Sequence, residues 1–366
     1  MTKRILRIAG ICIAVALVVL LALPKNHYIT KALIYQKAKI HHYKVFENRT
    51  IEAGEGQPWA LHESYNTIAL TPEQEATLEQ YQTVAFLVAL DSLLLFEAYW
   101  DDYGPESLSN SFSMAKSIVS LLVGCALDDG YIASLEQPVG DFIPEFNEGL
   151  KQRITIRDLL TMSSGLSWDE AYASLFSTTT KAYYGKHLRE LTLNQEVIGD
   201  PSVEHIYLSG DTQLLSFIVS AATGKTLSEY ASERLWKRIG AEQDALWSLD
   251  RKDGVEKAYC CFNSNARDFA RIGRLILNKG NWEGYQVVSE WYIEESLNPA
   301  THLADVELGG KPTTRYGYQW WITHHKGYDV FFARGILGQY IFIIPDMELV
   351  AVRLGKKRSD ERIEGN

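Results

Sequence analysis

Residues 109–130 read SNSFSMAKSIVSLLVGCALDDG, and this stretch decides the fold. Ser113 and Lys116 stand three residues apart at its start, and an almost unbroken apolar run follows them up to the turn at Gly130. A run that is apolar on every face predicts a buried helix, because the rest of the protein has to cover it. Residues three apart lie on one face of a helix, so the Lys116 amine can reach the Ser113 hydroxyl.

Two interpretations of this pair are open. In the first, Ser113 only caps the helix and Lys116 is an ordinary surface residue. In the second, the apolar helix carries Lys116 into the interior, where desolvation disfavours the ammonium and makes the amine a base for the Ser113 hydroxyl. The positive end of the helix would then favour an anionic serine oxygen. The Ser-x-x-Lys pattern alone is weak, since about one match is expected by chance in a chain of this length.

A proton carrier for such a pair has to come from elsewhere in the chain. Tyr-x-Ser occurs three times, at Tyr172, Tyr207 and Tyr230. Tyr230 falls in a periodic helix and is typical of core packing, whereas Tyr172 lies in a polar loop. Tyr207 lies in a turn before a helix that is expected to begin near Asp211, a place from which a side chain can face a cleft. A phenol has a pKa near 10 that a close ammonium lowers, so Tyr207 is the predicted shuttle.

The hydrophobic periods change twice along the chain. Residues 82–100 form two apolar, β-prone runs broken at Asp91-Ser92, which predicts a hairpin. Residues 113–300 have helical periods, with Thr155 as a helix cap and Asp158 three residues later. From residue 316 onward the chain is β-prone again, with a turn at IPDMEL. The pattern predicts an α+β fold: one antiparallel sheet built from both ends of the chain, flanked by helices, with a large helical region inserted.

Composition excludes some functions. The 366 residues are 46% hydrophobic and 22% charged, which is typical of a globular protein, and the net charge of −10 disfavours nucleic acid as a partner. The histidine pairs 41–42 and 324–325 have no carboxylate or cysteine at ligand spacing, so we expect surface residues and no metal site. Cys260 and Cys261 are neighbours, which rarely bond to each other, and no disulfide framework is expected.

The N-terminus differs from the rest of the chain. Lys3, Arg4 and Arg7 precede an apolar run at residues 8–23, and Pro24 ends it. Residues 1–24 are therefore either a cleaved signal peptide or a retained transmembrane helix, and the lack of a small-residue cleavage site favours the anchor. The basic residues would keep the N-terminus in the cytoplasm. The expected location is a bacterial inner membrane, with the catalytic domain on the periplasmic side and the membrane as a partner.

Four segments, taken in order, resemble one family: SMAK, ITIRDLLTMSSGLSW, YLSGDTQLLSFIVSAATGK and ARGILGQYIFIIPD. They are similar to the serine β-lactamase-like hydrolases, which include class C β-lactamases, D-alanyl-D-alanine carboxypeptidases, some esterases and 6-aminohexanoate-dimer hydrolases. The last branch is the most similar, through RGILGQY and the aromatic C-terminal strands. The resemblance covers about residues 80–355, and the shared order of motifs is far more specific than any one of them.

The resemblance implies roles for particular residues. Ser113 would be the nucleophile, Lys116 its general base and Tyr207 the proton shuttle, with the backbone N–H groups of Ser113 and Ile336 as the oxyanion hole. No metal or organic cofactor is implied.

The same resemblance implies a substrate-binding set that departs from the family at one motif. The usual Lys-Thr-Gly or His-Thr-Gly falls on Ala333-Arg334-Gly335, so the cation is one position away from its usual place. That departure leaves β-lactam and peptide recognition open. The expected substrate-binding residues are Ser209, Arg334, Gly335 and Trp168.

The resulting prediction divides the chain into an anchor or signal at 1–24, a connector at 25–80, the hydrolase domain at 81–355 and a polar tail at 356–366. The expected activity is cleavage of an amide or ester bond in a small or short peptide-like substrate through an acyl-enzyme. The alternatives are a D-Ala-D-Ala carboxypeptidase or β-lactamase, and a non-catalytic cell-envelope binding protein that retains the fold. The sequence gives no oligomeric state.

Overall fold

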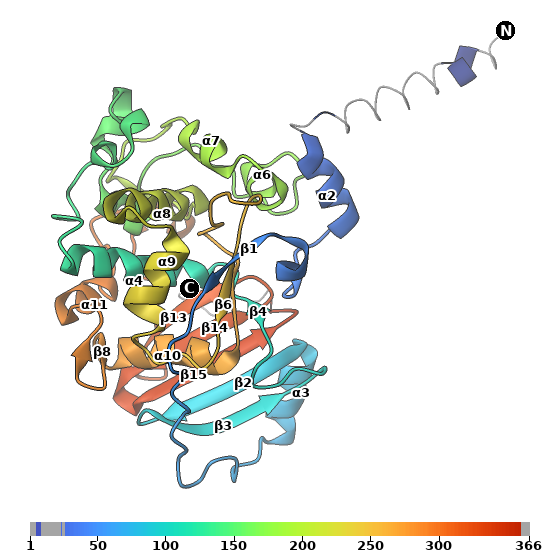
Figure 1. The fold of residues 1–366 in the computed structure, drawn as a ribbon, viewed down its shortest axis with the longest axis vertical. Helices are drawn as coiled ribbons and strands as arrows, with labels where there is room; N and C mark the ends of the chain where they lie inside the picture. Colours follow the sequence, from blue (N-terminus) through green and yellow to red (C-terminus); the bar gives the residue numbers. More distant parts are fainter. Residues whose placement is uncertain (1–4, 9–22, 24–25, 360–366) are drawn as a thin grey trace.

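The computed structural model describes residues 5–8, 23 and 26–359 (Figure 1). The α-helices, joined by short 3₁₀ and π turns, are α2 (His27–Tyr35), α3 (Pro72–Gln80), α4 (Met114–Asp128), α5 (Ile156–Leu160), α6 (Thr178–Tyr184), α7 (Leu188–Leu193), α8 (Ser209–Thr223), α9 (Leu227–Ala231), α10 (Ala266–Leu277) and α11 (Glu290–Ser296). The longer strands are β1 (Asn48–Ile51), β2 (Thr83–Leu90), β3 (Leu93–Tyr99), β6 (Ala245–Ser248), β7 (Phe262–Ser264), β12 (Trp321–His325), β13 (Tyr328–Gly335), β14 (Gln339–Ile344) and β15 (Leu349–Gly355). The two-residue strands are β4 (Ser109–Asn110), β5 (Glu204–His205), β8 (Asn281–Trp282), β9 (Tyr285–Gln286), β10 (Ala304–Asp305) and β11 (Lys311–Pro312).

Both ends of the chain build the main sheet, as the sequence predicts. Its six strands lie in the order β12-β13-β14-β15-β2-β3, all antiparallel, and β15 from the C-terminal region pairs with β2 from the N-terminal one. The predicted hairpin at 82–100 is confirmed as β2 and β3. Asp91 and Ser92 at its turn have positive φ angles of 48° and 61°, the geometry that matches the twist of paired strands.

Helices cover the sheet and fill the inserted region (Figure 1). Helix α10 packs on β14, β15 and β2, and α4 contacts β13 and β14. Gly273 brings α10 close to the sheet, because a Cβ there would lie only 2.4 Å from a methyl group of Val350. In the inserted region α8 packs against α4 and α5. These contacts fix α4 and the start of α8 beside one end of β13.

Local signals in the inserted region act as expected. Thr155 caps α5 and forms the predicted reciprocal pair with Asp158: each backbone N–H donates to the other side chain. Helix α8 ends at Gly224, which has a φ of 69° and is left-handed as glycine C-caps commonly are. A second, smaller sheet has the order β1-β6-β7-β4, and its strand β1 comes from within residues 25–80.

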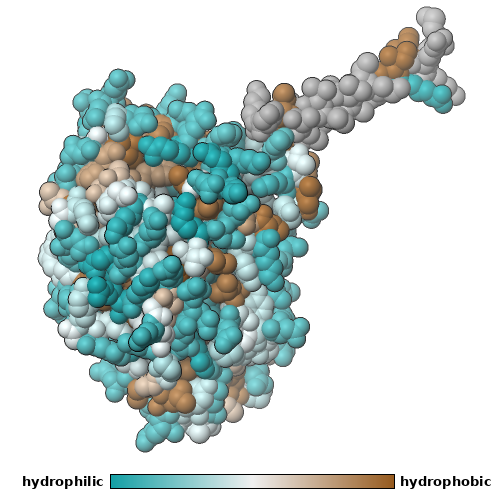
Figure 2. Space-filling view, viewed as in Figure 1, coloured by the Kyte–Doolittle hydropathy of each residue, from teal (hydrophilic) through white to brown (hydrophobic). Residues whose placement is uncertain are grey.

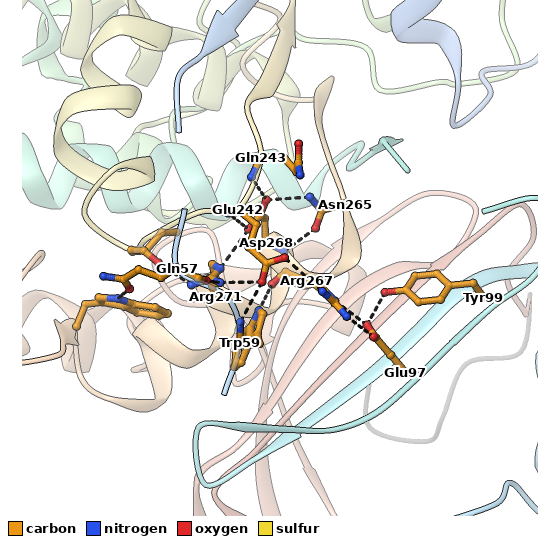
Figure 3. Close-up of polar contacts among 12 residues, drawn as sticks. Gln57, Trp59, Glu97, Tyr99, Glu242, Gln243, Asn265, Arg267, Asp268 and Arg271 are labelled. Carbon is orange, nitrogen blue, oxygen red and sulfur yellow. Dashed lines mark hydrogen bonds and ion pairs between the residues drawn. The ribbon is translucent and has the colours of Figure 1, made fainter. Parts of the chain in front are cut away.

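A network of paired charges ties β3 to α10 and to the loop before β6 (Figure 3). We call Glu97, Glu242, Arg267, Asp268 and Arg271 the paired network. Arg267 bonds both Glu97 and Glu242, while Arg271 bonds Glu242 and Asp268, each at 3.1 Å. Asp268 also accepts the backbone N–H groups of residues 242 and 243. Every charge in the network faces an opposite charge.

Two expectations from the sequence are wrong. Cys260 and Cys261 form a disulfide bond with each other. The chain turns there, with a positive φ at Cys261, and the two neighbouring sulfurs meet despite the usual rule. His42 is buried rather than on the surface, and its ring lies 3.3 Å from the Tyr183 hydroxyl among packed aromatic rings.

The sequence predicts a transmembrane helix or signal peptide at residues 1–24, and the structure describes only a few residues of this segment. Across residues 5–8, 23 and 26–359, no helix is long and apolar enough to cross a membrane. The apolar run at 8–23, for which a transmembrane helix is expected, lies almost wholly outside the described residues.

Candidate active site

The chain makes a sharp turn immediately before Ser113. Phe112 is buried with a φ of 45°, an unusual conformation for a bulky residue, and its N–H donates to the Asn110 side chain at 2.9 Å. Ser113 then occupies the N-cap position of α4, yet its side chain makes no capping hydrogen bond. The capping interpretation therefore does not account for Ser113, whose hydroxyl is left for other partners.

Lys116 lies inside the protein. Its side chain is carried inward by α4, whose residues from Met114 to Ala126 are all buried, and Lys116 itself is 1% exposed. The Lys116 Nζ atom donates to the Ser209 hydroxyl at 3.0 Å and to the Tyr259 carbonyl at 2.9 Å, and it lies 3.4 Å from the Ser113 hydroxyl. The predicted reach from Lys116 to Ser113 is present.

The amine has no direct carboxylate partner among the described residues. Burial lowers the pKa of Lys116 to about 8, and the more distant charges of Glu170 and Asp211 only partly oppose this shift. Asp211 is itself fully buried, which raises its pKa well above the usual range and weakens it as a counter-charge. A substantial fraction of Lys116 is therefore neutral in mildly alkaline solution.

Tyr207 joins the same group. Lys116 Nζ lies 5.0 Å from the centroid of its ring, and the phenol is hydrogen-bonded to Ser113. Burial raises the pKa of Tyr207, whereas the sequence interpretation expects a nearby ammonium to lower it. That expectation is wrong, because desolvation of the phenol outweighs the Ser113 hydrogen bond and the nearby positive charges. Tyr207 thus holds its proton at neutral pH.

Ser209 connects the lysine to an acid that the sequence analysis did not single out. The Ser209 hydroxyl donates to Glu170 Oε1 at 2.6 Å, and its backbone N–H donates to Glu170 Oε2 at 3.0 Å. Tyr172 also donates to Oε1, at 2.6 Å. Ser209 is 1% exposed at the start of α8, so this hydroxyl is a fixed part of the site.

Two backbone N–H groups lie at the ends of the elements that frame the site. Neither the Ser113 nor the Ile336 N–H donates a hydrogen bond to any of the described residues. Gly335, at the end of β13, packs so closely on the Ser111 carbonyl that a Cβ would lie 2.2 Å from that oxygen. Glycine is therefore required for β13 to approach the Ser113 segment.

Arg334 is the only charged residue of the Ala-Arg-Gly motif at residues 333–335. Its guanidinium carbon lies 3.7 Å from the centroid of the Trp321 ring, and Trp321 in turn packs against Tyr207 at 5.5 Å. No hydrogen bond or ion pair joins the Arg334 guanidinium to any other residue that the structure describes. Mostly enclosed and without a partner, the guanidinium can bind an acceptor from outside the chain.

Trp168 lies behind the site rather than in its opening. The side chain is 4% exposed, its ring packs edge-on against Tyr259, and its N–H donates to Thr179 at 2.9 Å. Gly210 at the start of α8 leaves room for it, since a Cβ there would lie 2.6 Å from the indole ring. Trp168 thus supports Tyr259, whose carbonyl holds Lys116.

Two contributors to the site were missed by the sequence analysis. Glu170 lies in an irregular loop, and Tyr259 acts through its carbonyl, so neither leaves a periodic or spaced pattern.

Glu190 fits a Glu-x-x-Leu-Asn pattern, but its side chain is 72% exposed on α7. Among the described residues its carboxylate pairs only with His187. In the described part of the chain, no cluster of three or more His, Cys, Asp or Glu side chains could hold a metal ion.

The chain is similar to known proteins in both sequence and fold. A family model described as Beta-lactamase matches residues 73–365. A 6-aminohexanoate-dimer hydrolase from Paenarthrobacter ureafaciens is 29% identical over 301 residues, which cover 77% of this chain and 75% of that protein. The solved structure "Putative 6-aminohexanoate-dimer hydrolase from Bacillus anthracis" superposes with a TM-score of 0.77 at 22% identity, over 88% of each chain. A family VIII carboxylesterase gives a TM-score of 0.60 at 17% identity, over 78% of this chain and 90% of its own.

Proposed function

Because the chain belongs to the Beta-lactamase family and is a hydrolase of that fold, we propose that it cleaves an amide or ester bond through an acyl-enzyme on Ser113. One observation carries the proposal. A buried lysine, with no direct carboxylate partner among the described residues, lies 3.4 Å from a serine hydroxyl that caps nothing. The amine is therefore in reach of a hydroxyl that its neutral form can deprotonate.

Acylation begins with the neutral form of Lys116. Its amine takes the Ser113 hydroxyl proton as the serine oxygen forms a bond to the substrate carbonyl carbon. The carbonyl oxygen becomes an anion, which the N–H groups of Ser113 and Ile336 bind. Tyr207 then gives its proton to the leaving nitrogen or oxygen, the bond to that atom breaks, and the proton on Lys116 restores the phenol.

Deacylation repeats these steps with water in place of serine. The Tyr207 and Lys116 pair takes a proton from water as the water oxygen attacks the acyl carbon, and the Ser113 oxygen leaves with a proton in return. All the proton transfers use groups that the chain itself supplies.

The substrate class is proposed from the relatives and from Arg334. The curated relative is named for hydrolysis of the 6-aminohexanoate dimer, a linear amide, so a small amide is the first candidate. Arg334, mostly enclosed and without a partner for its guanidinium among the described residues, would bind a carboxylate or carbonyl oxygen of the substrate. Gly335 would let the substrate approach the last residues of β13, beyond Phe332, where β12 no longer pairs with this strand. Ser209 would act on the substrate only through Lys116. Trp168 would support the site from behind.

A substrate panel tests this function. Purified protein would be assayed on p-nitrophenyl esters, on the 6-aminohexanoate dimer, on nitrocefin and on D-Ala-D-Ala peptides, with Ser113→Ala as the control. The proposal predicts hydrolysis of an ester or linear amide that is lost in Ser113→Ala. Hydrolysis of nitrocefin or peptide alone would favour the β-lactamase or carboxypeptidase alternative, and no turnover or labelling by any acylating reagent would favour a binding protein.

We also propose that residues 1–24 hold the protein at a bacterial inner membrane, with the site outside the cytoplasm. Leu33 and Ile34 on α2 are 51% and 66% exposed, and hydrophobic surface lies over this helix (Figure 2). The Cys260–Cys261 disulfide fits an oxidising compartment. Fractionation and C-terminal alkaline phosphatase fusions test this location, and a soluble, phosphatase-inactive fusion would contradict it.

A further inference from the structure

The hydrogen bonds around Lys116 leave little freedom in where each proton lies. A neutral amine has two N–H hydrogens and one lone pair. The Tyr259 carbonyl can only accept, so it takes one hydrogen at 2.9 Å. If Ser209 takes the other, at 3.0 Å, the lone pair is left for the Ser113 hydroxyl 3.4 Å away.

That outcome depends on the direction of the Ser209 hydroxyl. Ser209 has a single hydroxyl hydrogen, and if this hydrogen pointed to Lys116 it would occupy the lone pair that Ser113 needs. Glu170 prevents this, because its carboxylate accepts the Ser209 hydrogen at 2.6 Å and can only accept when ionised. Ser209 must therefore accept from Lys116 rather than donate to it.

Glu170 is itself firmly held. Its two oxygens accept from the Ser209 hydroxyl, the Ser209 N–H and the Tyr172 hydroxyl, three donors from two segments of the chain. It makes no direct bond to Lys116, so it orients the lysine through Ser209, while its charge also raises the pKa of the amine. The other groups that face Lys116 are the buried Asp211 and the rings of Tyr207 and Tyr259.

We propose that Glu170 is a positioning residue for the reaction, which orients the Ser209 hydroxyl so that the lone pair of Lys116 faces Ser113. The inference rests on the proposed function, since it concerns the same base and nucleophile. Glu170 touches neither reacting atom, and its effect on the direction of the lone pair passes through one hydroxyl.

The test uses Glu170→Gln in the full-length protein with a p-nitrophenyl ester as the probe. An amide at this position places an N–H₂ group against Ser209, which releases the serine hydrogen toward Lys116. We expect kcat to fall by about tenfold or more, the loss typical of a broken hydrogen bond to a charged group. Glu196→Gln is the matched control, because Glu196 is exposed and the change removes the same charge; its activity should equal that of the wild type.

A pH profile separates positioning from simple folding support. The negative charge of Glu170 raises the pKa of Lys116, so Glu170→Gln should move the acidic limb of the kcat/KM profile to lower pH. Glu170→Asp keeps the charge, so it should lower kcat but move this limb by less. If Glu170→Gln does not fold, Glu170→Asp decides the test through its kcat and the position of its acidic limb.

A double-variant cycle then tests the route through Ser209. If Glu170 orients the lone pair only through that hydroxyl, Glu170→Gln combined with Ser209→Ala should be no slower than Ser209→Ala alone, within about threefold, on the alkaline plateau where Lys116 is neutral in both variants. Losses that multiply, or an unchanged profile in Glu170→Gln, would overturn the inference. Wild-type protein that fails to hydrolyse any ester would instead overturn the proposed function.

Discussion

Two charged regions of this molecule are buried in opposite ways. In the paired network, Arg271 has a side chain only 2% exposed and bonds both Asp268 and Glu242. In the active site, Lys116 is just as buried but bonds two hydroxyls and a carbonyl, with no carboxylate partner among the described residues. Burying a charge is costly unless an opposite charge lies beside it, and the unpaired amine responds by losing proton affinity. The paired charges therefore support the fold, whereas the unpaired amine of Lys116 lies beside a candidate nucleophile. Missing pairing alone does not identify a site, because Lys257 is also fully buried with no carboxylate bonded to its amine among the described residues.

The comparison predicts that Lys116→Met removes activity and spares the fold. We expect kcat/KM to fall by about 10⁴-fold or more, as for other members of a catalytic unit. Because the variant replaces an unpaired buried amine with an apolar side chain, stability should be unchanged or should rise by about 1–2 kcal/mol. Urea denaturation alongside ester hydrolysis measures both quantities. A destabilised but active variant would break the comparison.

Arg271→Met should have the reverse effect. It leaves Asp268 and Glu242 buried with one partner fewer, and breaking a buried pair costs about 3–5 kcal/mol. Activity per folded molecule should be unchanged, since the network does not contact Lys116. Denaturation gives the stability, and titration of the active serine gives the folded fraction. Full stability in this variant would show that the paired network does not support the fold.

Tyr207→Phe sharpens the comparison within the active site. A p-nitrophenolate leaves without a proton, whereas an anilide nitrogen needs one, so we expect a loss of about 10²-fold on a p-nitroanilide and a much smaller loss on the matching ester. Tyr99, whose hydroxyl bonds Glu97 in the paired network at 2.6 Å, is the matched control. Tyr99→Phe should cost about 1 kcal/mol of stability and leave both rates unchanged. Equal losses on both substrates would exclude Tyr207 as the proton donor.

The smallest change in stability is expected when a solvent-exposed ion pair is removed. Arg153 and Asp200 bond at 2.9 Å, but their side chains are 53% and 64% exposed. Arg153→Met should change the free energy of unfolding by less than about 1 kcal/mol, because solvent screens the pair. Denaturation in low and high salt measures it, and a larger loss would show that pairing alone, without burial, stabilises this protein.

The sequence predicts the parts of this molecule that depend on local patterns. The hairpin at Asp91-Ser92, the cap at Thr155 and the return of the C-terminal strands to β2 follow from periodicity and turn residues. The closeness of Ser113 and Lys116 follows from helix spacing. These features need only neighbours in sequence, or a single alternation of apolar residues, to be recognised.

Other features depend on contacts between distant segments and were not predicted. Glu170 reaches Ser209 from an irregular loop, and the Tyr259 carbonyl reaches Lys116 over 143 positions of sequence. The raised pKa of Tyr207 depends on how completely the fold covers it, and the bond between Cys260 and Cys261 on a turn that the fold imposes. Burial and chain direction at these positions depend on how the whole protein packs, so they cannot be predicted from a short segment of sequence.

The central claim, that neutral Lys116 activates Ser113, is tested most directly by the pH dependence of serine labelling. Wild-type protein would react with a fluorophosphonate between pH 6 and 10, and peptide mapping by mass spectrometry would locate the adduct. The account predicts a single adduct on Ser113, with a rate that rises tenfold per pH unit and levels off above about pH 8, where Lys116 is neutral. An adduct on another residue, or a rate on Ser113 that does not change with pH, would contradict it.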